Sequence, residues 1–483
     1  MAQQNSDRLT AVDAGFLHQE GPAAHMHIGG VTVFEGPPPP FEEILDQVRC
    51  RLHLLPRYRQ RLARPPLQSG NPVWIDDPAF NLEYHVRRTA LPAPGKRAQL
   101  REATAQIFSQ RLDRSKPLWE LWIVEGIETG RWALISKTHH ALIDGISGID
   151  IATALLDLTP EGTEVPHPDA AWQPRPVPSA SEMLATGILG AARAGVLGAT
   201  KAIEAFGRPR AAAGRVREIG EGIGEMAWEL MNPAPDTPLN VPIGPHRRYR
   251  AVEGRLETFR RIKDHFGGTV NDVVLAVVTS ALRDWLQSRG ARTEGLELRA
   301  LVPVSVRTTD ERGQLGNRLT AMRGPLPVYI DDPVQRMEAI RRSMRGLKES
   351  KQALGAETIA NVQNFAPPTV LAQASRLNFS TRLFNVLVTN VPGPQFPLYL
   401  RGRRMERAFP VAFLPKDHAL AIAILSYDGA VNFGLIGDHD ALPDLKFIAD
   451  GIARAIDELD DLARAGGDGT GSPASASLRT AAP

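Results

Sequence analysis

Residues 139–145, His-His-Ala-Leu-Ile-Asp-Gly, place two histidines, an aspartate and a glycine within seven positions. A histidine side chain titrates near pH 6.5, so a neutral ring here could take a proton from a hydroxyl and return it to a leaving group. Imidazole nitrogens and a carboxylate are also zinc ligands. A third interpretation is two core histidines that precede a turn. The elements that carry these residues decide among the three.

The run before and including the histidines, "WALISKTHH" at 132–140, has the apolar and branched residues of a buried strand. Successive side chains of a strand point to opposite faces, so His139 and His140 would point apart. A zinc-binding helix would carry histidines at i and i+4, which this stretch lacks, and the other histidine-rich place is "HMH" at 25–27. The pattern favours proton transfer by one ring over a metal site, with two core histidines as the alternative.

Asp144 follows His140 by four residues and stands next to Gly145, at an expected strand-to-helix turn. Its carboxylate could brace the loop, or it could orient the imidazole as in a catalytic triad. The nearby "GISG" lacks the GxSxG spacing of a nucleophile elbow, and Ser147 there is suited to capping the next helix. The spacing therefore favours the brace.

Composition sets the context of this cluster. A chain of 483 residues with 43% apolar content predicts two domains, because single cores stop growing at about 250–300 residues. A net charge of +2 does not suggest a nucleic-acid partner, and the single Cys50 cannot form an internal disulfide. The N-terminal "MAQQNSDRL" has no apolar signal-peptide core, and no apolar run reaches the ~20 residues of a membrane span. We expect a cytoplasmic protein.

The pattern of elements predicts a mixed α/β chain in four parts. Strand-like and helical stretches alternate over residues 1–160 and again over 246–464, whereas residues 161–245 are rich in Pro, Ala and Gly and read as a linker with one amphipathic helix. The tail, residues 465–483, is too poor in large apolar residues to pack and is predicted to be disordered.

Two local features of the second half are specific. The stretch "VNDVVLAVVTSALRDWL" has apolar residues at helical spacing, after Thr269 and Asn271 as candidate caps. The stretch "LAIAILSYDGAVNFGLIGD" predicts a hairpin that turns at Asp428-Gly429.

Ordered motifs then carry a resemblance to a known family. "HHALIDG" matches the HHxxxDG motif of the CoA-dependent acyltransferase superfamily. "SKPLWELWIVEG" contains Pro117-Leu118-Trp119, "TVNDVVLAVV" contains Asn271-Asp272, and "NVLVTNVPGP" and "SYDGAVNFGL" follow. From about residue 9 to 460 the chain resembles the bacterial wax ester synthase/diacylglycerol acyltransferases. Small departures, such as Gly15 where that family often has serine, affect only the details of the pocket.

The resemblance implies a fold and a reaction. The fold is α/β, with two chloramphenicol-acetyltransferase-like domains, each a mixed sheet with flanking helices, around a central tunnel. The reaction is the transfer of a fatty acyl group from acyl-CoA to diacylglycerol or a long-chain alcohol, and His140 would be its general base. His139, Asp144 and Gly145 would support it, and Arg59 or Arg61 is the candidate partner of Asp144.

Further roles have alternatives that the sequence leaves open. Asn271, Asp272 or Asn390 could position the substrate or its oxyanion, but the Asn271-Asp272 pair also suits a helix N-cap and Asn390 could satisfy backbone groups at a strand end. Pro117, Leu118 and Trp119 read as packing beneath the site.

The resemblance also implies partners. Acyl-CoA would be a co-substrate, with no bound cofactor and no metal. Insoluble products require a lipid surface, so we expect peripheral association with the inner membrane face or with lipid inclusions. The stretch 183–207 suits interfacial binding as well as an interdomain helix. A condensation-type enzyme and a non-catalytic lipid-binding protein are the rival functions.

Overall fold

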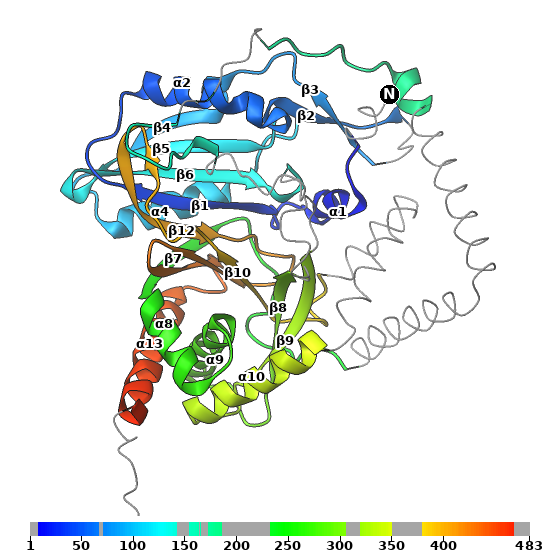
Figure 1. Ribbon diagram of the computed structural model, residues 1–483. Coiled ribbons are helices and arrows are strands. Elements are labelled where there is room, and N and C mark those ends of the chain that lie inside the picture. Colours follow the sequence, from blue (N-terminus) through cyan, green and yellow to red (C-terminus); the bar gives the residue numbers. More distant parts are fainter. Residues whose placement is uncertain are drawn as a thin grey trace, which may run out of the picture.

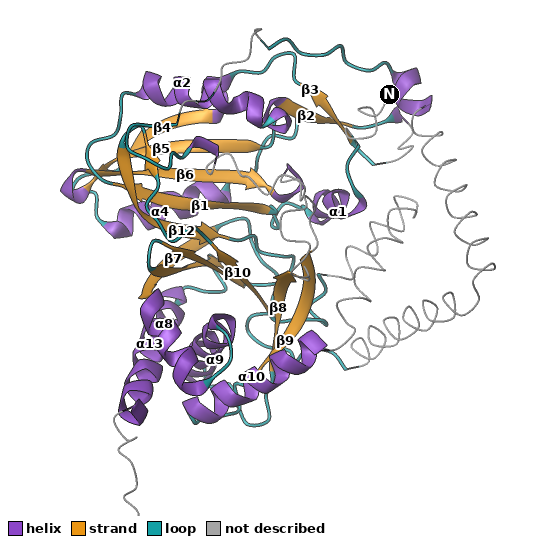
Figure 2. Cartoon of the chain, in the orientation of Figure 1, coloured by secondary structure: helices purple, strands orange, loops and turns teal. Residues whose placement is uncertain are grey.

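The computed structural model describes residues 8–66, 71–142, 154–163, 165, 172–185, 232–305, 319–349 and 379–467. Within these ranges the strands form two six-stranded sheets and one two-stranded ribbon, and helices flank the sheets (Figures 1 and 2). The predicted mixed α/β architecture with two sheet-containing domains is confirmed.

The first sheet has the strand order β11-β12-β1-β6-β5-β4. Its N-terminal strands are β1 (His27–Phe34), β4 (Val86–Ala90), β5 (Trp119–Ile127) and β6 (Arg131–His139). A ribbon of β2 (Gln60–Ala63) and β3 (Val73–Asp76) lies beside it, and the helices of this part are α1 (Ala11–Gln19), α2 (Phe41–Arg51), α3 (Leu82–His85) and α4 (Arg97–Ser109), with short 3-10 turns at η2 (Leu52–Leu54), η3 (Pro56–Arg59), η5 (Glu128–Gly130) and η6 (His140–Leu142).

Alternation along β6 places its side chains in two different cores. Trp132 and Leu134 pack with residues of α2, whereas Ala133 and Ile135 pack with residues of α4. The core on the α4 side also includes residues of the second sheet, such as Leu387. The two sheets therefore share apolar packing, and α4 lies in the layer where they meet.

The second sheet has the order β7-β14-β13-β10-β8-β9. Its strands are β7 (Arg247–Arg255), β8 (Leu298–Ser305), β9 (Leu319–Leu326), β10 (Val386–Pro392), β13 (Leu420–Tyr427) and β14 (Ala430–Asp438). Four helices pack with this sheet around one large apolar core: α8 (Leu256–Phe266), α9 (Val270–Ser288), α10 (Pro333–Glu349) and α13 (Leu445–Gly467) (Figure 1).

One strand crosses from the C-terminal part of the chain into the first sheet. Strand β12 (Arg403–Val411) pairs antiparallel with β1, from Gly29 opposite Val411 onward, and β11 (Tyr399–Leu400) extends this edge. The hydroxyl of Tyr249 in β7 donates to the carbonyl of Pro410, 3.3 Å away. Strand β12 thus ties the two sheets together.

The helix and the hairpin predicted for the second half are confirmed, but of the two candidate caps only Thr269 is the N-cap, because Asn271 lies inside the helix. Helix α9 begins at Val270 with Thr269 as its N-cap, and Asp272 completes the capping box. Strands β13 and β14 form a hairpin with Asp428 at φ 43° and Gly429 at φ 81°, the positive angles that a tight two-residue turn requires.

No single helix in the described ranges is long and apolar enough to cross a membrane. Helices α8 and α9 reach that length and composition only together, and they are bent by 97°. Most of the predicted linker helix and the predicted disordered tail lie outside the described residues, because 186–231 and 468–483 are not among them.

Candidate active site

Strand β6 ends at His139, and His140 begins the 3-10 turn η6. The expected strand through residue 140 is therefore one residue too long. The last pair that β6 forms with β1 joins His139 to His27. The backbone N–H of His140 then donates to the carbonyl of Met26, 2.9 Å away, so the turn stays attached to the residue before β1.

The ring of His140 lies among aromatic side chains from both parts of the chain. Phe16 of α1 stacks on it with centroids 3.9 Å apart and an angle of 16°. Phe413, which follows β12, meets it edge-on at 5.5 Å, and Phe379 contacts both phenylalanine rings at about 6 Å. We call Phe16, Phe379 and Phe413 the aromatic cage.

Burial in the cage determines the protonation state of His140. Burial lowers its pKa from 6.5 to about 4, against a smaller opposing effect of its own backbone and a small repulsion from His139. Its Nδ1 atom is enclosed and, among the residues that the structure describes, forms no hydrogen bond with another residue. The ring is therefore neutral at pH 7, which is the form that accepts a proton.

His139 occupies different surroundings. Its Nδ1 accepts a hydrogen bond from the N–H of Ala141 at 3.0 Å, and its Nε2 lies 3.7 Å from Oε2 of Glu20, which is an ion-pair distance rather than a hydrogen bond. The ring of His27 meets it edge-on at 6.1 Å. Burial lowers the pKa of His139, although Glu20 acts in the opposite direction. Only His140, of the two, faces the aromatic cage.

The predicted brace of the loop cannot be placed. Asp144 and Gly145 lie outside the described residues, as does Ser147. Of the two candidate arginines, Arg59 lies over the ring of Trp172 at 5.0 Å, and Arg61 lies 3.8 Å from Asp77.

The Pro117-Leu118-Trp119 motif contacts the end of β6. Leu118 and Trp119 are fully buried, and the carbonyl of Leu118 accepts the N–H of His139 at 3.0 Å. The indole of Trp119 donates to the carbonyl of Tyr58 at 2.8 Å and stacks on His85 at 4.5 Å.

The two asparagine motifs meet each other. Nδ2 of Asn390 in β10 donates to Oδ1 of Asn271 in α9 at 3.3 Å. Asp272 instead binds the backbone and hydroxyl of Thr269, as a helix cap does. Between the described residues no hydrogen bond or ring contact links Asn271 or Asn390 to His140.

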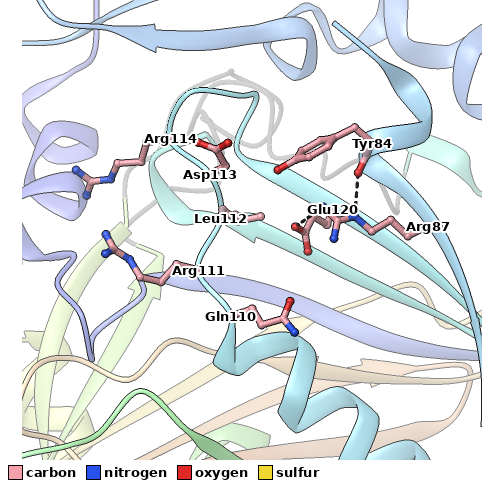
Figure 3. Close-up of a pocket in the computed structure, with 8 residues that line it drawn as sticks. All are labelled: Tyr84, Arg87, Gln110, Arg111, Leu112, Asp113, Arg114 and Glu120. Carbon is pink, nitrogen blue, oxygen red and sulfur yellow. Dashed lines mark hydrogen bonds and ion pairs between the residues drawn. The ribbon is translucent and has the colours of Figure 1, made fainter.

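A cavity of about 540 Å³ opens beside the loop between α4 and β5 (Figure 3). It is lined by Tyr84, Arg87, Gln110, Arg111, Leu112, Asp113, Arg114 and Glu120. In Figure 3, Arg111 and Arg114 point away from Tyr84 and Glu120. Both of these arginines form ion pairs with Glu20, which links the cavity wall to His139.

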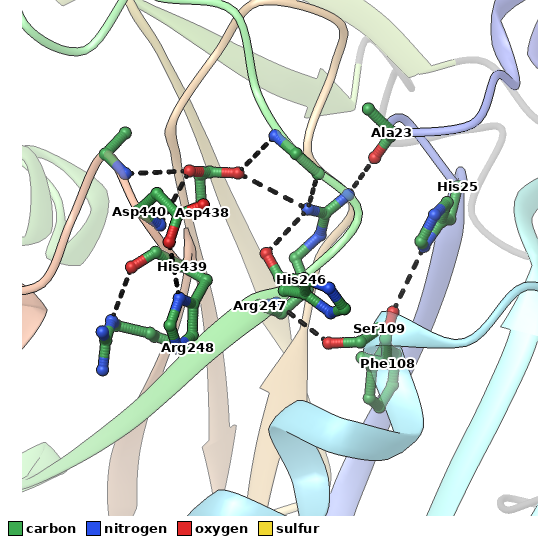
Figure 4. A network of polar contacts seen from close by, with 12 residues as sticks. Ala23, His25, Phe108, Ser109, His246, Arg247, Arg248, Asp438, His439 and Asp440 are labelled. Atoms are coloured by element: carbon green, nitrogen blue, oxygen red, sulfur yellow. Dashed lines mark hydrogen bonds and ion pairs between the residues drawn. The ribbon is translucent and has the colours of Figure 1, made fainter.

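A second polar network joins the two parts of the chain near α4 (Figure 4). Arg247, at the start of β7, lies 3.9 Å from Asp438, and its guanidinium donates to the carbonyl of Ala23. The N–H of Arg247 donates to the hydroxyl of Ser109 at the end of α4. This network holds the segment between α1 and β1, which also carries Met26 and leads directly into His27 of β1.

Sequence reasoning missed Phe16, Glu20, Met26 and Phe413. The first three lie in the N-terminal segment "LTAVDAGFLHQEGPAAHMHIGG", to which the sequence analysis assigned no chemistry. The signal that could have found two of them is the four-residue spacing of Phe16, in the short helix α1, and Glu20, the residue that caps its C-terminus. No group of three His, Cys, Asp or Glu side chains that could hold a metal ion occurs in the part of the chain that the structure describes.

Comparison with known proteins identifies the family. The profile of the "Wax ester synthase/diacylglycerol acyltransferase catalytic domain" matches residues 9–274, and that of the "WS/DGAT C-terminal domain" matches residues 315–460. The chain belongs to the wax ester synthase/diacylglycerol acyltransferase family. It is therefore an acyltransferase, and the family assigned from the ordered motifs is confirmed.

Relatives cover nearly the whole chain. A probable diacylglycerol O-acyltransferase of Mycobacterium tuberculosis strain H37Rv is 35% identical over 457 residues, which are 94% of this chain and 96% of the relative. A second probable diacylglycerol O-acyltransferase of that strain is 33% identical over 472 residues, 95% of this chain and 100% of the relative.

Solved structures agree with the fold. The wax ester synthase/diacylglycerol acyltransferase from Marinobacter aquaeolei VT8 has a TM-score of 0.68 and 28% identity, and covers 95% of this chain and 100% of that chain. The first condensation domain of the calcium-dependent antibiotic synthetase has a TM-score of 0.57 at 16% identity, covers 95% and 96%, and shows the shared fold alone.

Proposed function

We propose that this enzyme transfers a fatty acyl group from acyl-CoA to the hydroxyl of diacylglycerol or of a long-chain alcohol, with His140 as the general base. Acyl-CoA is the donor and leaves as free CoA, and the proposal needs no resident cofactor. The observation that carries it is the enclosure of the His140 ring by an aromatic cage that both parts of the chain build, since burial there lowers its pKa and favours the neutral ring.

The proposed step balances its proton within one ring. Because Nδ1 is enclosed, Nε2 of His140 is the nitrogen that takes the proton as the hydroxyl oxygen attacks the thioester carbonyl carbon. The new C–O bond forms, the C–S bond breaks, and the CoA sulfur leaves as a thiolate. The thiolate then takes the proton from the ring, which returns to its neutral form.

The cage keeps the ring in its neutral form and favours release of the proton, but it also makes the ring a weaker base in the first half of the transfer. Burial keeps the ring neutral before the reaction, since the pKa of His140 is about 4. The same burial makes the imidazolium costly, so the proton passes readily to the thiolate. Phe16, Phe379 and Phe413 also exclude water, which would otherwise compete with the alcohol for the acyl group.

Lipid substrates determine where the enzyme works. Diacylglycerol, fatty alcohols and their esters dissolve poorly in water, so we propose peripheral association with the inner face of the membrane or with lipid inclusions. The segment proposed for this contact, 183–207, is described only up to residue 185.

The direct test supplies purified enzyme with palmitoyl-CoA and either diacylglycerol, hexadecanol or no acceptor. We expect release of free CoA thiol that depends on the acceptor, together with triacylglycerol or wax ester as the product. A reaction that contains both acceptors ranks the two activities by the ratio of triacylglycerol to wax ester. Thiol release without an acceptor, with free fatty acid as the main product, would contradict the proposal.

A second arm tests the role of the free ring. Dialysis against a chelator is expected to leave the transfer rate unchanged, because the proposed base must keep its nitrogen uncoordinated. Loss of transfer that added zinc restores would argue for a metal-activated water instead.

A further inference from the structure

We propose that Glu20 is a positioning residue for His140 and acts through His139, by fixing the tautomer whose Nδ1 atom holds the turn that carries His140. The inference rests on the proposed function for its catalytic consequence. Its structural part concerns only the proton of His139, which can be measured independently.

The first step is the direction of one hydrogen bond. The backbone N–H of Ala141 lies 3.0 Å from Nδ1 of His139. A backbone N–H can only donate, so Nδ1 must accept, and the proton of the neutral ring must reside on Nε2. The opposite tautomer would leave the N–H of Ala141 facing another N–H inside the protein.

The second step is the partner of Nε2. Among the described residues, Oε2 of Glu20 lies 3.7 Å from Nε2, and each of the two side chains is only 1% exposed. A buried carboxylate favours the tautomer that points its N–H at it, because the alternative would direct a lone pair at a negative charge. Glu20 therefore selects the tautomer that Ala141 needs.

The third step is what holds Glu20. Arg114 forms an ion pair with its carboxylate and donates to the carbonyl of Leu17 at 3.0 Å, and Arg111 lies 3.4 Å from the same carboxylate. Burial alone would raise the pKa of Glu20, but contacts with His139 and the charge of Arg114 outweigh it and lower the pKa. The carboxylate stays ionised and fixed in place.

The fourth step connects this pair to His140. The N–H of Glu20 donates to the carbonyl of Phe16, so one turn at the end of α1 presents Phe16 to His140 and Glu20 to His139. The three successive backbone N–H groups at 139, 140 and 141 bind Leu118, Met26 and the ring of His139 in turn. The ring bond is the only one of the three that depends on a proton position.

The kinetic test compares Glu20→Gln, Glu20→Leu and a control, Glu406→Leu. Glutamine removes the charge but keeps a side-chain oxygen whose dipole can face the N–H of Nε2, whereas leucine removes both. Glu406 pairs with Arg131 at the other end of β6, so its loss removes an ion pair far from the histidines, in a more exposed setting than that of Glu20. We expect Glu20→Leu to lower kcat roughly 100-fold with little change in KM for acyl-CoA, because misplacing a catalytic group by about 1 Å costs that much. Glu20→Gln and Glu406→Leu should stay within a few-fold of wild type.

A substitution of His139 tests the acceptor directly. In His139→Asn the side-chain oxygen can occupy the place of Nδ1 and accept from Ala141, whereas His139→Leu cannot. We expect His139→Asn to retain clearly more kcat than His139→Leu. Equal loss in the two folded variants, or full kcat in Glu20→Leu, would overturn the proposal.

The structural test needs no activity. In enzyme labelled with 15N-histidine, the resonance that disappears in His139→Asn belongs to His139, and its Nδ1 should show the shift of an unprotonated nitrogen while Nε2 carries the proton. A protonated Nδ1 in wild type would overturn the inference even if Glu20→Leu failed to fold. If wild type transfers no acyl group to any acceptor, the proposed function fails, and this spectrum still decides the tautomer.

Discussion

Gly434 of β14 lies against the backbone of Pro410 in β12 so closely that a Cβ atom on the glycine would be 1.7 Å from the carbonyl oxygen of Pro410. Because β12 belongs to the first sheet and β14 to the second, this contact joins the two parts of the molecule. Phe413 follows Pro410 by three residues and meets the ring of His140 edge-on. The spacing of the sheets and the shape of the aromatic cage therefore depend on the same glycine.

We expect Gly434→Ala to push the two sheets apart. The clash is with backbone, which cannot move aside as a flexible side chain can, so we expect a loss of about 1–3 kcal/mol in the free energy of unfolding. Transfer activity should fall as well, since Phe413 moves with β12. Urea unfolding and the initial rate measure the two effects.

Gly346→Ala is the matched control. Gly346 lies in α10, and apart from its own helix backbone no described atom lies within 4 Å of where its Cβ would be. Alanine favours helix over glycine by roughly 1 kcal/mol, so this variant should be as stable as wild type or more stable, with full activity. If both variants behave alike, the contact at Gly434 does not set the spacing of the sheets.

We expect His140→Asn to lose transfer roughly 10²- to 10⁴-fold, the usual contribution of a general base. His418→Asn is the comparison. His418 is also buried and stacks on a phenylalanine, Phe384, with ring centroids 4.2 Å apart, but it lies just before strand β13 of the second sheet. His418→Asn should lower stability while its remaining folded fraction keeps kcat. The assay is thiol release with a saturating acceptor, normalised to the folded fraction by circular dichroism. Comparable kcat values in the two variants would remove His140 from the mechanism.

Local patterns were sufficient for the elements that follow one periodicity. The branched run of β6, the helical spacing of α9 and the turn at Asp428-Gly429 each contain their own signal within a few residues. The predicted end of this strand was one residue too late. The N–H of His140 donates to the carbonyl of Met26, and this partner lies far away in the sequence.

The cage around His140 could not be predicted from local patterns. Phe413 reaches the site because β12 pairs with β1, and β12 has the sequence "RRMERAFPV", whose charges and proline do not read as a strand inside a sheet. Pairing of this kind depends on register between distant segments. Glu20 was missed for a related reason, since its partners His139, Arg111 and Arg114 all lie far away in the sequence.

The pH profile of transfer should reflect the burial of His140. The neutral ring is the base, so activity persists above the pKa of the ring and is lost below it. With a pKa of about 4 in place of 6.5, kcat/KM for the acceptor at saturating acyl-CoA should remain level through pH 6.5 and decline only near pH 4. Enzyme held at each pH and returned to pH 7 separates this decline from unfolding.

Phe413→Asn sharpens this prediction. A polar side chain in the cage admits water, which weakens the desolvation that lowers the pKa of His140. The acidic limb of the profile should then move upward toward pH 6.5. If the activity of wild type already declined at pH 6.5, or if the acidic decline did not move in Phe413→Asn, the cage would not set the pKa of His140.

Stability should also depend on pH through buried histidines, and His85 offers the clearest case. It is 1% exposed, its Nδ1 lies 2.8 Å from the carbonyl of Trp119, and burial lowers its pKa to about 4. Because the folded pKa is below the unfolded 6.5, the unfolded chain binds the proton first as the pH falls. Stability is therefore complete above pH 6.5 and is lost between pH 6.5 and about 4, by up to about 3 kcal/mol for this ring.

His85→Asn removes the titrating group and keeps a donor for the carbonyl of Trp119. It loses the stacking on Trp119, so we expect it to be less stable than wild type at pH 8. Below pH 6.5 the gap between the two proteins should narrow, because only wild type pays for keeping this ring neutral. Urea unfolding of both proteins at pH 8, 6.5 and 5 measures the gap, and the other histidines and the carboxylates contribute equally to both and cancel. A gap that stays constant across this range would mean that His85 titrates alike in the folded and unfolded chains.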